Sequence, residues 1–107
     1  MKRAKRQRLE AKGWKIGRTE DLLQLTDDEI AYIELKLALS VRLKSMREQR
    51  SMTQVELARR IHSSQSRVAK MEAGDPSVSL DLLVRSLLAL GATRKQIAGA
   101  LAATRAA

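Results

Sequence analysis

Three short motifs mark helix starts along this chain of 107 residues. In each, Glu or Gln follows a threonine three residues later, as in Thr26-x-x-Glu29. The two side chains of such a capping box can bond each other's backbone N–H groups, which holds the first turn of a helix. The other two motifs begin at Thr53 and Thr93. Because the chain has only one proline and five glycines to interrupt helices, we expect an all-α fold.

The apolar residues between these starts recur at helical spacing. Five helices are expected, over residues 26–49, 53–62, 63–73, 79–90 and 93–103. Either Ser63 or Ser64 can cap the third. The side chains expected to point inward are Ile30, Ile33, Leu35, Leu37, Leu39, Val41, Leu43, Met46, Val55, Leu57, Ala58, Ile61, Val68, Met71, Leu80, Leu83, Val84, Leu87, Leu88, Leu90, Ile97 and Leu101. The stripe on the first helix is wider than one neighbouring helix covers, so part of it could face another chain.

The net charge of the chain points to a polyanionic partner. Lys and Arg outnumber Asp and Glu by 21 to 12, for a formal charge of +9. Basic residues dominate 1–18 and 42–107, whereas 19–41 is acidic. The longest apolar run is far below the roughly 20 residues that cross a bilayer, and no apolar export segment follows the basic start. We therefore expect a cytoplasmic protein with no membrane contact and nucleic acid as its leading partner class.

Residues that the chain lacks exclude several functions. It has no cysteine, one histidine (His62) and only 2% aromatic residues. Disulfides, thiolate or histidine metal sites and cysteine nucleophiles are therefore not expected, nor are binders that stack unpaired bases on aromatic rings. No phosphate loop or metal motif is present. We expect no catalytic residues, no metal and no cofactor.

Residues 53–74 have the layout of a helix-turn-helix, in which two short helices are joined by about three residues and the second is polar along one face. MTQVELARRIHSSQSRVAKMEAG at 52–74 resembles the lambda-repressor-like (Cro/repressor, XRE) helix-turn-helix family, and the resemblance extends over about 40–92. It implies a five-helix domain that binds double-stranded DNA. Ala58 is small, as expected where the two helices approach closely.

The polar residues of this motif are the candidate DNA-binding site. The candidates are Gln54, Ser64, Gln65, Ser66, Arg67 and Lys70. The resemblance implies base reading by Gln65, Ser66 and Lys70, and base or phosphate contacts by Ser64 and Arg67. Gln can pair with adenine and Arg with guanine through two hydrogen bonds each. Gln54, in the first turn of its helix, would contact a phosphate. A merely solvated polar face is the alternative interpretation.

Two further features of the motif are structural. The resemblance implies an ion pair between Arg47 and Glu72 that fixes the recognition helix. His62 stands at a turn position where the family usually has a left-handed glycine, so we expect strain there. Ser51 likewise replaces a common turn Gly or Asn.

The expected organisation is a basic, mobile arm over 1–18, a helical extension over 19–39, the DNA-binding domain over 40–92 and a C-terminal helix and tail over 93–107. The arm could follow the DNA backbone, lie on a membrane surface or aid solubility. We favour the DNA backbone, because such arms occur among DNA-binding proteins and the apolar face that membrane binding needs is missing.

The expected function is a transcriptional regulator, a repressor, that binds a palindromic operator as a homodimer. The dimer would form through Leu80–Leu90 with Thr93–Ala103, or through Ile30–Leu39. The chain also resembles HigA-type antitoxins, in which case Trp14–Leu39 would bind a toxin protein. The alternative is an adaptor that uses this fold to bind protein or RNA.

Overall fold

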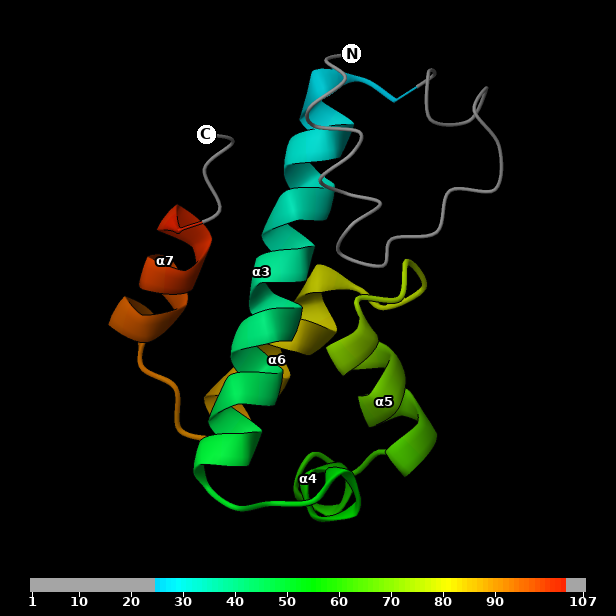
Figure 1. Ribbon diagram of the computed structural model, residues 1–107, viewed down its shortest axis with the longest axis vertical. Helices are drawn as coiled ribbons and strands as arrows, with labels where there is room; N and C mark the ends of the chain where they lie inside the picture. Colours follow the sequence, from blue (N-terminus) through cyan, green and yellow to red (C-terminus); the bar gives the residue numbers. More distant parts are fainter. Residues whose placement is uncertain (1–24, 104–107) are drawn as a thin grey trace.

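The computed structural model describes residues 25–103. This part of the chain consists of helices α3 (Asp27–Gln49), α4 (Gln54–Arg60), α5 (Gln65–Ala73), α6 (Leu80–Ala89) and α7 (Arg94–Ala102), with no strand (Figure 1). The expected all-α fold is confirmed. The predicted basic arm, the first part of the helical extension and the end of the C-terminal tail lie outside the described residues.

Each helix of the described part begins after a serine or threonine whose hydroxyl accepts a hydrogen bond from a backbone N–H three residues later. The three predicted capping boxes are all present. In the box of α4, hydrogen bonds with Thr53 lower the pKa of the Glu56 carboxyl. Ser64 rather than Ser63 caps α5. Helix starts are therefore determined by short local sequences.

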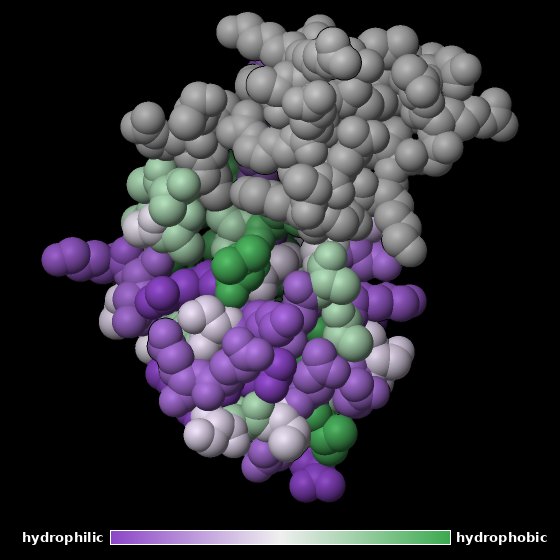
Figure 2. All heavy atoms as spheres, in the orientation of Figure 1, coloured by the Kyte–Doolittle hydropathy of each residue, from purple (hydrophilic) through white to green (hydrophobic). Residues whose placement is uncertain are grey.

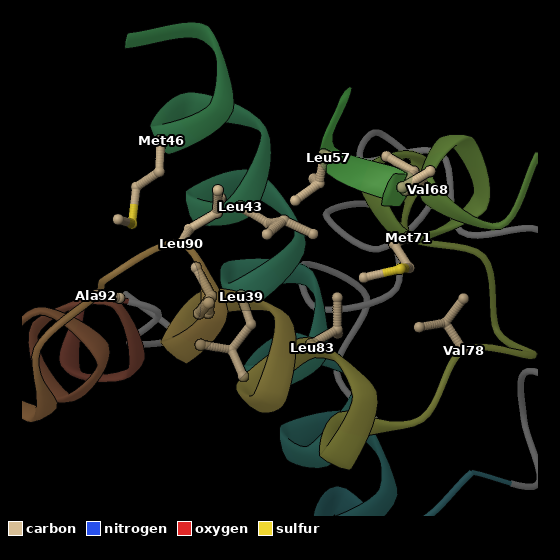
Figure 3. Close-up of a cluster of buried hydrophobic side chains, with 12 residues drawn as sticks. Leu39, Leu43, Met46, Leu57, Val68, Met71, Val78, Leu83, Leu90 and Ala92 are labelled. Atoms are coloured by element: carbon tan, nitrogen blue, oxygen red, sulfur yellow. The ribbon is translucent and has the colours of Figure 1, made fainter. Parts of the chain in front are cut away.

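Helix α3 runs along the whole domain and contacts α5, α6 and α7, while α4 packs on α5 (Figure 1). Figure 3 shows core side chains from several helices pointing toward one another, with Leu43 of α3 near Leu57 of α4 and Met71 of α5 near Leu83 of α6. The main core consists of Leu39, Leu43, Met46, Leu57, Ala58, Val68, Met71, Val78, Leu83, Leu87, Leu90 and Ala92. No helix within the described range is long and apolar enough to span a membrane.

The first half of α3 carries a second, smaller apolar cluster. Ile30, Ile33 and Leu37 are buried there, with Leu25 packed against them. Two charged side chains on the same stretch, Glu34 and Lys36, are also buried, which the apolar pattern did not predict.

Three predicted core residues are exposed instead. Val41, Leu88 and Val55 expose 64%, 50% and 47% of their surface. Val41 belongs to the wide stripe of α3, which the neighbouring helices cover only in part. Leu88 follows the buried Leu87, and one residue turns the side chain by about 100° around a helix. Val55 lies two residues before the buried Leu57, which places it on another side of α4.

Two turn residues have left-handed backbone conformations. His62, between α4 and α5, has φ of +56°, and Ser51, between α3 and α4, has φ of +54°. The conformation predicted for His62 is confirmed. A side chain with a Cβ atom is disfavoured in this region, and glycine is not.

Replacing His62 by glycine should therefore stabilise the protein. We expect His62→Gly to raise the free energy of unfolding, measured by urea denaturation, by about 1 kcal/mol because the left-handed strain is removed. The control is Ser63→Gly, next in the chain but without positive φ, which should destabilise because glycine gains more freedom on unfolding. A His62→Gly variant no more stable than the wild type would contradict strain at this turn.

Candidate DNA interface

Helix α5 is held by its inward side and offers its other side to solvent. Val68 and Met71 are fully buried against the rest of the domain. Leu57 and Ala58 of α4 are buried as well, and the 4% exposure of Ala58 agrees with the close helix approach expected there. The packing therefore fixes which residues of α5 point outward.

The predicted DNA-contacting residues lie on this outward side, with one exception. Ser64, Gln65, Ser66, Arg67 and Lys70 are exposed, whereas Gln54 is half-buried. Hydrophilic side chains cover much of the region where α4 and α5 lie (Figure 2). The exposed side of the second helix of the motif is thus mostly polar.

Four of the predicted residues border one hollow of about 310 Å³. It is lined by Ser64, Ser66, Arg67, Lys70, Ser77 and Val78. The last two come from the loop after α5, and sequence reasoning missed them because a loop has no periodicity that predicts its course. Arg67 and Lys70 give the hollow a positive charge.

The other two predicted residues bond each other. The Gln65 Nε2 donates to Gln54 Oε1 at 2.7 Å, and the Gln54 Nε2 donates to Glu72 Oε1 at 3.1 Å. Gln54 is therefore held within the protein rather than pointing freely to solvent. The sequence analysis missed this link. The sequence feature that could have indicated this hydrogen bond is that each glutamine is the first residue of its helix.

The ion pair predicted between Arg47 and Glu72 is present and nearly buried. The guanidinium donates from Nη2 to Glu72 Oε1 at 2.9 Å and from Nε to Glu72 Oε2 at 2.5 Å. Its Nη1 donates to the Met52 carbonyl at 2.7 Å. The two side chains are 12% and 3% exposed, and the hydrogen bonds to Glu72 raise the pKa of Arg47. Paired hydrogen bonds of this kind fix direction as well as distance.

Residues 38–105 match the family of helix-turn-helix domains. The match covers more than half of the chain, which therefore belongs to this family. In this chain the two helices of the motif are α4 and α5. A search of curated proteins and a search of solved structures gave no match. Since α3 begins at Asp27, its first part precedes the matched region.

No cluster of three or more His, Cys, Asp or Glu side chains within residues 25–103 is arranged to hold a metal ion.

Removing the Glu72 carboxylate should leave the Arg47 guanidinium buried without its partner. We expect Glu72→Ala to lower the free energy of unfolding by about 3 kcal/mol, measured by urea denaturation. The control is Glu48→Ala, one residue after Arg47 but exposed, which should change stability by less than about 0.5 kcal/mol. Equal effects of the two substitutions would contradict a fixed ion pair.

Proposed function

We propose that this protein is a transcriptional repressor that binds a specific double-stranded DNA sequence as a dimer, with α5 as the recognition helix. The observation that best supports this proposal is that α5 has one buried side, with Val68 and Met71, and one exposed polar side. A helix held in this way can enter the major groove without losing its packing.

Gln65 is the leading base-reading residue in this proposal. Its bond to Gln54 uses one of its two amide N–H groups. The carboxamide retains a second N–H and a carbonyl oxygen, the pair that recognises adenine. Since Gln54 is itself bonded to Glu72, the Gln65 amide is orientated before it meets DNA, which reduces the entropic cost of binding.

The hollow beside α5 supports a complementary contact with the DNA backbone. Arg67 and Lys70 supply positive charge there, and Ser64 and Ser66 supply hydroxyl donors. Residues 42–107 carry twelve basic and five acidic residues. One of those acids, Glu72, is neutralised by Arg47. The surface near α5 is therefore suited to a polyanion.

We propose a dimer because one domain of this kind contacts only about half of an operator. Each of the two proposed dimer faces contains one exposed large hydrophobic residue. Leu88 of α6 lies on the first face and Tyr32 of α3 on the second, exposed by 50% and 47%. Burial of such a residue between two copies would contribute to association.

A more specific form of this proposal is that the repressor is also an antitoxin, which binds a toxin protein. Its support is that α3 begins before the region matched by the family, so a segment not needed for the family's domain is available to a toxin protein. The proposed toxin-binding region, Trp14–Leu39, lies partly outside the described residues. Cytoplasmic location fits the same role.

The test is selection of duplexes from a random DNA pool, followed by affinity measurements on the enriched site. We expect a palindrome with half-sites about one helical turn apart. Gln65→Ala should weaken binding by about 1–3 kcal/mol and relax the base preference at one position of each half-site.

Lys70→Ala should weaken binding to all sequences and reduce the slope of log K against log salt by about one for each phosphate that the protein no longer neutralises. The matched control is Arg85→Ala, which removes the same charge from an exposed position on α6, and should leave the slope unchanged. No enriched sequence and no salt-dependent binding would contradict the proposal and favour a protein- or RNA-binding adaptor.

A further inference from the structure

The loop between α5 and α6 is built by bonds to its own residues and to α5. It leaves α5 at Gly74, which has φ of +73°. The Asp75 N–H donates to the Lys70 carbonyl at 3.0 Å. The Asp75 Oδ1 in turn accepts from the Ser77 N–H at 2.9 Å and from the Ser77 hydroxyl at 2.7 Å. Asp75, Ser77 and the end of α5 therefore form one ordered unit.

This loop separates two depressions in the surface. Ser77 and Val78 line the hollow that contains the exposed residues of α5. Pro76, between Asp75 and Ser77, lines a second depression of about 380 Å³ beside the first half of α3. Moving the loop toward or away from α5 would therefore change the width of the hollow.

Helix α3 holds this loop through two consecutive residues. The Lys36 Nζ donates to the Pro76 carbonyl at 3.2 Å. Leu37 lies so close to Gly74 that a Cβ atom added there would be 2.6 Å from Leu37 Cδ2. One residue thus holds the middle of the loop and the next holds its start.

Burying a lysine to fix a loop costs free energy, because its charge is removed from water. Only 7% of Lys36 is exposed, and its Nζ lies 5.6 Å from the centre of the Tyr32 ring. Burial lowers the pKa of this ammonium, and the Asp75 carboxylate opposes that shift. An apolar side chain would pack there without the cost of removing a charge from water. The lysine adds a directed bond to Pro76 and an attraction to the Asp75 carboxylate, both in the same loop.

We propose that Lys36 is a positioning residue for DNA recognition, which sets the loop of residues 74–78 against α5 and so the width of the hollow. This inference rests on the proposed function and gives a task to the part of α3 that precedes the family match. Lys36 lies on the other side of the loop from the hollow, so it acts through Pro76 and not by touching DNA.

The test compares Lys36→Met, which keeps all but the last atom of the side chain's length and removes its ammonium, with Lys36→Arg, which keeps a charged donor. The control is Lys44→Met, an exposed lysine of the same helix. Two quantities are measured on the full chain well below its melting temperature: the Kd for the selected duplex and the amide chemical shifts of Ser77 and Lys70.

We expect Lys36→Met to raise the Kd by about 2- to 30-fold, the range for residues that act through a packed network, and to shift both amides. Lys36→Arg should restore most of the affinity, and Lys44→Met should leave both amides unmoved. If Lys36→Met does not fold, Lys36→Gln takes its place in the same comparison.

Unchanged amides, or a Kd that changes equally in Lys36→Met and Lys44→Met, would overturn the inference while leaving the proposed function intact. A Lys36→Met variant that only melts earlier, with unchanged Kd, would also overturn it. A wild type that binds no duplex would overturn the proposed function, and the link to recognition with it.

Discussion

The arrangement of the helix-turn-helix depends on one nearly buried pair of charges. Arg47 lies in the last turn of α3 and Glu72 near the end of α5. Arg47 also donates to the Met52 carbonyl before α4, and Glu72 accepts from Gln54 at the start of α4. A single ion pair thus connects three helices. Because burying two charges offsets much of their attraction, its main contribution is to specify one arrangement of these helices rather than to add stability.

Features determined by nearby residues could be predicted from the sequence. The predicted helix starts agree with the structure. Each start is determined within four residues, by a hydroxyl and by the backbone N–H from which that hydroxyl accepts a hydrogen bond. The inward position of Val68 and Met71 followed in the same way from local spacing. The left-handed turn at His62 was predicted instead from the resemblance to a known family. The Arg47–Glu72 pair spans a longer distance in the chain, and only the resemblance to a known family predicted it.

Features determined by distant parts of the chain could not be predicted. Whether Val41 or Leu88 is buried depends on which helix lies opposite, and apolar periodicity does not contain that information. The burial of Lys36 depends on a proline carbonyl forty residues away. Ser77 and Val78 joined the candidate site because a loop folds back beside α5. The link between Gln54 and Gln65 required the relative placement of two helices.

The Ser64 cap has a consequence for how such a protein can change its target sequence. By fixing the first residue of α5, it fixes the rotation of the helix about its own axis, since a shift of one residue would turn every side chain by about 100°. Such a shift would move Val68 out of the core. With the rotation fixed at Ser64 and at the buried face, substitutions on the exposed face leave the rest of the fold unaffected. Under the proposed function, base preference can therefore evolve on this face, at Gln65 first, while the architecture stays the same.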